Sequence, residues 1–189
     1  MLISIPDYWA AKAVDSAKKT SVLDKGIYSI YFFNIIKANP GEAVFQDAGI
    51  PHVYLEGQNM ELMANSDNIL RGGLTPKHLD VNELLKYVVF EETIPNIMHG
   101  ELQTDGIERI YKSPAPDFEL SQITLNNSKL YTSSSKTAQI LILINGEANI
   151  VENDTVLNLK KRDAVLLKAN SSYQICSISK EVIYKATPP

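Results

Sequence analysis

The sequence predicts a mainly β protein that begins with one helix and carries a second, short helix near residues 80–88. From Phe118 onward, short apolar segments alternate at close spacing with turn residues, which is typical of a β-sandwich or barrel. Residues 6–19 are alanine-rich and free of breakers after Pro6, which a first helical turn tolerates. In LDVNELLKYVV, residues 79–89, the apolar positions 81, 84, 85 and 88 mark one helical face.

The segment between these helices reads as the later strands of a first lobe. Residues 27–38, IYSIYFFNIIKA, are rich in β-branched and aromatic side chains and stop at the turn signal Asn-Pro-Gly, so a long buried strand is predicted. Short strands are expected near residues 42–45, 52–55 and 60–64. Trp9 is expected to dock the first helix against a barrel.

Falling apolar content with Pro95, Gly100, Gly106, Pro114 and Pro116 indicates a boundary between two lobes. The predicted organisation is a helix and connector at 1–25, a first lobe at 26–90, a connector at 91–117 and a second lobe at 118–189. The hydrophobic strands of the second lobe show no convergent polar set, so no site is predicted there.

The two lobes share a faint internal repeat. Aligning residues 40–55 with residues 161–176 pairs Glu42 with Asp163 and places Tyr173 where His52 stands. The alternative is two strand hairpins that converged on one pattern.

Composition excludes several functional classes. The chain has 189 residues with 18 basic and 22 acidic side chains, a net charge of -4 and no long run of one sign, so no nucleic-acid partner is expected. No apolar run approaches the roughly 20 residues of a membrane span, and the start lacks a secretion signal. A single cysteine, Cys176, cannot form an intramolecular disulfide, which favours the cytoplasm.

Two motifs carry a resemblance to a known family. In PGEAVFQDAGIPHVYLEG, the spacing of Gly41, Asp47, Gly49 and His52 resembles the second cupin motif, with Asp47 where that motif usually has proline. Residues 50–85, IPHVYLEGQNMELMANSDNILRGGLTPKHLDVNELL, resemble the C-terminal signature of type I mannose-6-phosphate isomerase. From Phe118 onward the resemblance is architectural only, to a second cupin lobe. It implies a cupin or jelly-roll β-sandwich with tandem lobes, the first incomplete.

The resemblance implies a zinc-dependent isomerase that interconverts mannose 6-phosphate and fructose 6-phosphate. His52 matches a zinc ligand and Arg71 the active-site arginine, while the pocket is lined or supported by Tyr54, Glu61, Asp67 and Lys77. The residue types suit this role, because arginine and lysine hold phosphate and a divalent ion stabilises an enediolate. Gly72 and Gly73 permit a close backbone approach or positive φ beside Arg71. His52 and Tyr54 are predicted to share one strand face that points into the barrel.

The match stops before the other zinc ligands of the family. The chain has no Gln-x-His sequence, and a catalytic zinc needs about three protein ligands. We therefore expect a C-terminal half that is inactive alone. The exposed strand edges of its incomplete first lobe are expected to be covered either by a second copy of the chain in a homodimer or by the missing N-terminal half.

Other readings remain open at this stage. The chain could be a metal-free cupin module that binds a sugar or sugar phosphate through Arg71, Lys77 and Tyr54, or an assembly protein whose strand edges recruit a partner. Asp67 either shapes a turn through its own backbone or acts in catalysis. His78 and His99 are expected to be solvated.

Overall fold

The computed structural model describes residues 5–17, 24–66, 68–126 and 129–189. The chain forms two compact units. The N-terminal unit comprises Met1–Asn59 and Asn65–Ile97, and the C-terminal unit comprises Met60–Ala64 and Met98–Pro189. Among the described residues, no helix has the length and apolarity that a membrane crossing requires.

The predicted N-terminal helix is confirmed as α1, Pro6–Ala17. Its buried face carries Trp9 and Ala10, which pack with Ile27 and Ile30 in a small core of the N-terminal unit. Trp9 therefore docks α1 against two short helical segments and not against a barrel, which corrects the prediction.

The predicted long strand at residues 27–38 is wrong. The chain instead forms a 3₁₀-helix η2, Lys25–Tyr28, and one turn of α-helix α2, Ser29–Phe32, before running on without regular structure. The Asp24 side chain caps η2 by accepting a hydrogen bond from the amide of Gly26. Ile27 and Ile30, three residues apart, face the small core, so capping and tertiary packing override β propensity.

The rest of the N-terminal unit has little regular structure. Strand β1, Ala43–Val44, falls within the predicted 42–45 segment and pairs with β2, Ile97–Met98. The predicted strands at 52–55 and 60–64 do not form, because no described strand pairs with them. The short predicted helix is confirmed as α3, Val81–Tyr87, where the Asp80 side chain accepts from the amide of Glu83 at 2.9 Å.

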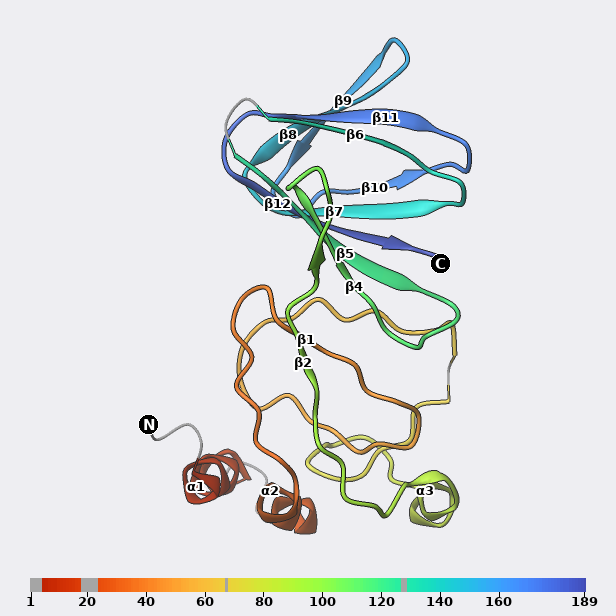
Figure 1. The fold of residues 1–189 in the computed structure, drawn as a ribbon. Coiled ribbons are helices and arrows are strands. Elements are labelled where there is room, and N and C mark those ends of the chain that lie inside the picture. Colours follow the sequence, from red (N-terminus) through yellow and green to blue (C-terminus); the bar gives the residue numbers. More distant parts are fainter. Residues whose placement is uncertain (1–4, 18–23, 67, 127–128) are drawn as a thin grey trace. The chain divides into compact units, whose positions relative to one another are not determined.

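The C-terminal unit is an antiparallel β-sandwich, as predicted. One sheet has the order β10-β7-β12-β5-β4-β3 and the other the order β6-β11-β8-β9 (Figure 1). The strands are β3 (Glu101–Leu102), β4 (Glu108–Tyr111), β5 (Glu119–Leu125), β6 (Leu130–Ser134), β7 (Gln139–Asn145), β8 (Glu147–Glu152), β9 (Thr155–Lys160), β10 (Ala164–Leu167), β11 (Ser172–Ser177) and β12 (Glu181–Thr187). The sequence predicted β5 to β11 but not β3, β4 or β12. Strands β3 and β4 lie within residues 91–117, where a connector was predicted.

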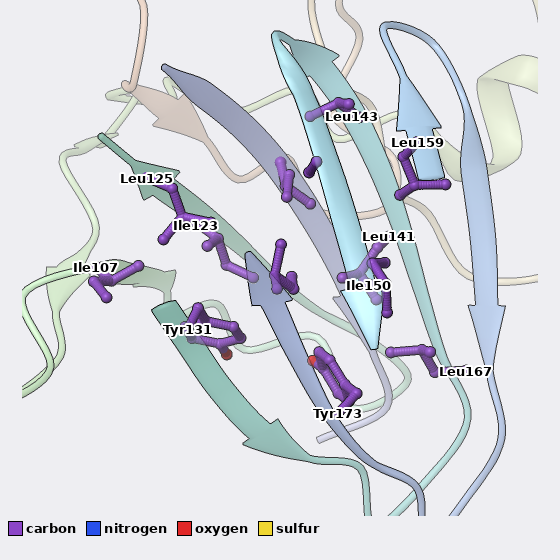
Figure 2. Packing of buried hydrophobic residues seen from close by; sticks show 13 residues of the cluster. Ile107, Ile123, Leu125, Tyr131, Leu141, Leu143, Ile150, Leu159, Leu167 and Tyr173 are labelled. Atoms are coloured by element: carbon purple, nitrogen blue, oxygen red, sulfur yellow. The ribbon is translucent and has the colours of Figure 1, made fainter. Parts of the chain in front are cut away.

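The core of the C-terminal unit lies between its two sheets. Alternate residues of facing strands point inward, as period-2 patterning requires. Leu141, Ile123 and Ile175 are completely buried, and Figure 2 shows how inward side chains of both sheets meet. Most of the apolar inward positions form one continuous cluster.

Candidate functional site

Two of the segments that carry predicted site residues rest on the same small core of the N-terminal unit. Leu55 follows His52 and Tyr54 directly, and Leu74 lies in the loop RGGLTPK that carries Arg71 and Lys77. Both leucines pack against the cluster of Trp9, Ala10, Ile27 and Ile30. The core thus gives the imidazole segment and the cationic loop a common base.

A single carboxylate ties the cationic loop to this base. Asp24 Oδ1 accepts from the amide of Gly26 at 2.7 Å, and Asp24 Oδ2 accepts from the amide of Leu74 at 2.6 Å. Hydrogen bonds to an ionised acceptor are stronger than neutral ones. Asp24 therefore caps η2 and fixes the loop with the same side chain.

Of the two glycines in the loop, Gly73 has the role that the sequence predicted, whereas Gly72 has neither a positive φ nor a close backbone neighbour. Gly73 has φ +137°, and a Cβ added there would lie 3.0 Å from the Cα of Gly26. A side chain would thus meet both backbone strain and a backbone clash. Gly73 lets the loop backbone approach η2 closely, which fixes the position of the backbone near Arg71.

His52 is exposed, and its ring orientation is set by the backbone. Its Nδ1 lies 3.1 Å from the carbonyl oxygen of Ile50. A carbonyl only accepts, so Nδ1 carries a proton, and in the neutral tautomer Nε2 is the nitrogen with the free lone pair. The ring meets that of Tyr54 edge-on, with centroids 5.9 Å apart, which agrees with the predicted shared face. The predicted inward orientation is not seen, because the isolated extended segment leaves both side chains exposed.

The turn before His52 is built by Asp47 and Gly49. Asp47 Oδ1 accepts from the amide of Ala48 at 2.8 Å, so an aspartate shapes the turn where the cupin motif usually has proline. Gly49 has φ +78°, and a Cβ there would lie 2.5 Å from the carbonyl oxygen of Tyr87. Its own carbonyl accepts from the amide of Val89 at 3.0 Å, which joins the turn to the end of α3.

The two predicted phosphate ligands are available for an anion. Arg71 is half-buried and Lys77 is exposed. Within the described residues, neither side chain forms an ion pair or hydrogen bond. An arginine fork and a lysine on one glycine loop suit a phosphate or carboxylate group.

For Glu61 and Asp67, the predicted role in the site stays a prediction. Glu61 is exposed and belongs to the Met60–Ala64 segment of the C-terminal unit. Asp67 lies outside the described residues. His78 and His99 are exposed, as predicted.

The residues that the structure describes do not complete a zinc centre. In the described part of the chain, no group of three or more His, Cys, Asp and Glu side chains is placed to hold a metal ion. The Nε2 of His52 suits one ligand position, but a catalytic zinc takes about three from protein. Two open hollows of about 230 and 290 Å³ lie in the C-terminal unit, and no predicted site residue lines either one.

The C-terminal unit contains a convergent polar set that the sequence analysis did not predict. The Lys185 ammonium lies 2.6 Å from Glu108 Oε1. The same carboxylate accepts from the hydroxyl of Ser121 at 2.6 Å and from that of Tyr131 at 2.7 Å. Nearby, the hydroxyl of Tyr173 donates to Gln139 Oε1 at 3.0 Å. The interior between the two sheets is therefore partly polar and charged.

This environment shifts the acidity of its members. Burial would raise the pKa of Glu108, but its bonds with Lys185, Ser121 and Tyr131 outweigh burial and hold the pKa below its usual value. Burial and the bond to Glu108 raise the pKa of Tyr131 far above its usual value. Burial raises the pKa of Tyr173 to about 12. The folded state thus favours an ionised carboxylate beside neutral phenols.

The residues missed by the sequence analysis had usable signals. Asp24 precedes Lys-Gly in the pattern of a helix cap. In EVIYKAT, Lys185 has the same parity as the fully buried Ile183, so period-2 reading places its side chain inside. The bond from Asp24 to Leu74 spans 50 residues and had no local signal.

Comparison with known proteins points to one family. No family model matches the chain. It is 39% identical over 149 residues to the mannose-6-phosphate isomerase of Escherichia coli strain K12, covering 79% of this chain and 38% of that protein. The human mannose-6-phosphate isomerase is 33% identical over 159 residues, with 80% and 38% coverage. The chain thus spans less than two fifths of the length of these relatives.

A solved structure agrees with the sequence matches. A mutant of phosphomannose isomerase from Salmonella typhimurium superposes with a TM-score of 0.78 at 30% identity, covering 95% of this chain and 46% of that one. The predicted mainly β fold, with an antiparallel sandwich, is confirmed. In sequence and in fold, the chain corresponds to a C-terminal portion of the mannose-6-phosphate isomerase family.

Proposed function

We propose that this chain supplies one wall of a cytoplasmic sugar-phosphate isomerase site, with mannose 6-phosphate and fructose 6-phosphate as substrates. The names of its relatives support the substrate class. The single cysteine, Cys176, is a free thiol, which suits a reducing compartment.

One observation carries the proposal. The segment of His52 and Tyr54 and the loop of Arg71 and Lys77 are fixed on one small core, and Asp24 holds the loop. Such support pre-organises functional side chains, which lowers the entropy lost when a ligand binds. Because the two cations have no partner in the described residues, their charge is available for a phosphate.

The chain's own residues have limited roles in this proposal. Arg71 and Lys77 bind the phosphate, and Tyr54 orients the sugar. His52 offers Nε2 as one ligand of a zinc ion, but no step of the reaction follows from one ligand alone. Glu61 and Asp67 remain proposed pocket residues on the strength of the family motif.

A separate polypeptide region is proposed to complete the site. The N-terminal unit exposes large apolar side chains, including Phe32 at 83% and Ile94 at 87%. Exposed apolar side chains and unpaired extended segments favour association. The partner proposed is a polypeptide equivalent to the part of the relatives that this chain does not match.

Binding of mannose 6-phosphate to this chain tests the phosphate wall. Isothermal titration calorimetry should show that Arg71→Ala weakens binding about 10-fold to 100-fold, since a charged hydrogen bond contributes roughly 1.5–3 kcal/mol. Lys37→Ala, an exposed cation elsewhere in the same unit, is the matched control and should bind like the wild type. Equal affinity for mannose and mannose 6-phosphate would remove the proposed phosphate site.

Complementation tests the isomerase proposal. The chain is mixed with the unmatched N-terminal portion of the Escherichia coli relative, and isomerase activity and zinc content are measured. Activity that needs both polypeptides and disappears in His52→Ala is expected. A stable homodimer that excludes the added polypeptide, or activity that survives His52→Ala, would count against this partner and this ligand.

A metal-free sugar-phosphate binding module is the second candidate. It is favoured by the cationic loop, which the chain anchors with its own Asp24. Phosphate-dependent binding without activity in the complementation assay would select this candidate.

A further inference from the structure

The ammonium of Lys185 is buried among polar side chains of the C-terminal unit, and this set of Glu108, Ser121 and Tyr131 is called the polar pocket. Lys185 is 6% exposed and Glu108 is 8% exposed. The ammonium lies 2.6 Å from Glu108 Oε1 and donates to the Tyr131 hydroxyl at 3.3 Å. It also lies 5.9 Å from the centre of the Tyr131 ring, within the range of a cation–π contact.

The pocket is built to receive a cation. Glu108 comes from β4 and Ser121 from β5, while Tyr131 comes from β6 in the other sheet. Ser121 and Tyr131 both donate to the carboxylate, so it stays ionised and fixed in position. Tyr131 uses its hydrogen in that bond, which leaves its oxygen lone pairs to accept from an ammonium.

The second tyrosine links this pocket to the internal repeat. Tyr173 takes the place of His52 when the two lobes are aligned, and its ring centroid lies 6.4 Å from that of Tyr131. Figure 2 shows the two phenol oxygens pointing toward one another. The repeat position of His52 is therefore held in the C-terminal unit by a phenol whose neighbour, Tyr131, contacts the buried ammonium.

The chemistry of the donor set favours an ammonium over a metal ion. One carboxylate and neutral hydroxyls fall short of the ligands that a zinc ion takes from protein. They match an ammonium, which has three donors and no acceptor. We propose that the interior of the C-terminal unit is a binding site for a primary alkylammonium ion, occupied in the native chain by the side chain of Lys185.

Removal of the tethered cation tests this site. Lys185→Ala deletes the three methylenes and the ammonium that n-propylammonium would restore. Thermal unfolding is followed by circular dichroism with increasing n-propylammonium chloride. The variant should melt below the wild type, and saturating n-propylammonium should raise its Tm by about 5 °C. The wild type, whose pocket is filled, should show no saturable rise.

Matched controls separate the pocket from general salt effects. Lys161→Ala removes an exposed lysine of the same unit and should not respond. Sodium propionate and 1-propanol carry the chain length without the positive charge and should not stabilise Lys185→Ala. Glu108→Gln combined with Lys185→Ala removes the carboxylate and should abolish the response.

Several outcomes would overturn the proposal. They include an equal Tm rise in wild type and Lys185→Ala, or a response that persists without Glu108. If Lys185→Ala does not fold in buffer, n-propylammonium is added during refolding, and recovery of the β-sheet spectrum is expected only when Glu108 is present. Failure of the ion to restore folding contradicts the proposed site.

Discussion

The two units of this chain differ in how far they bury their apolar and charged side chains. The C-terminal unit closes two sheets over one core and pairs its buried Lys185 with Glu108. The N-terminal unit has a core of four buried residues and leaves aromatic side chains such as Phe32 and Phe90 exposed. The motif with the strongest family resemblance lies in the less regular unit. Family resemblance in sequence and regular secondary structure are thus strongest in different units.

Breaking an ion pair should give the largest difference between the two units in the loss of unfolding free energy. Glu108→Gln leaves the buried Lys185 ammonium without its counter-ion and should cost about 3–5 kcal/mol of unfolding free energy in urea. Glu56→Gln removes the partner of Lys12 in an exposed pair of the N-terminal unit, where solvent screens the charge, so no measurable change is expected. Replacing both members of the buried pair by methionine should recover much of the loss. Equal effects in the two units would break the comparison.

Apolar truncation should show the same asymmetry at a somewhat smaller size. Leu141→Ala, at a position with 0% exposure, should lower the unfolding free energy by about 2–5 kcal/mol because it leaves a cavity. Phe32→Ala should stay within about 0.5 kcal/mol, as surface substitutions usually do. Urea denaturation measures both, and a large loss in Phe32→Ala would show that this ring is packed in solution.

Loss of the loop anchor should have a moderate effect. Asp24→Ala removes the cap of η2 and the bond to the Leu74 amide, which should cost about 1–2 kcal/mol. Binding of mannose 6-phosphate should weaken as well, since the Arg71 loop loses its support. Asp24→Asn keeps one acceptor oxygen, so its unfolding free energy should lie between those of the wild type and Asp24→Ala. Unchanged binding in Asp24→Ala would separate the anchor from the site.

Raising the pH should change the unfolding free energy least near neutrality and increasingly in the alkaline range. The pKa of Tyr173 is raised to about 12 by burial, against 10.0 when it is not perturbed. The folded state therefore keeps the neutral phenol, and this stability is present below pH 10 and lost as pH rises toward 12. Phenolate absorbance at 295 nm should show tyrosines that ionise only above pH 10. Titration of all nine tyrosines near pH 10 in the folded protein would contradict this.

Alternation of apolar and polar residues predicted most strands of the C-terminal unit, except where charged side chains point inward. Strands β4 and β12 were missed because Glu108, Glu181 and Lys185 interrupt the apolar pattern at buried positions. The burial of Glu108 and Lys185 depends on partners in other strands, which a local pattern does not contain, whereas Glu181 is bound by Ser177 and Ser179 close by in the sequence. The same long-range pairing hid the polar pocket.

The N-terminal unit was predicted by its motif better than by its propensities. Residues 27–32 were expected in a strand, yet the Asp24 cap and the packing of Ile27 and Ile30 produce helical turns. The motif also predicted the imidazole segment and the cationic loop as site segments, and both stay predictions, whereas the close backbone approach expected at Gly73 is seen. The anchor that joins them to one core arises only in three dimensions.

Unfolding followed by two probes tests the difference between the units most directly. Trp9 is the single tryptophan and lies in the small core of the N-terminal unit, so its fluorescence reports that unit alone, whereas circular dichroism reports mainly the strands of the C-terminal unit. In urea, the Trp9 transition should occur at a lower denaturant concentration than the loss of β-sheet signal. If the two transitions coincide in the wild type and still coincide in Leu141→Ala, the account of two separately stabilised units is contradicted.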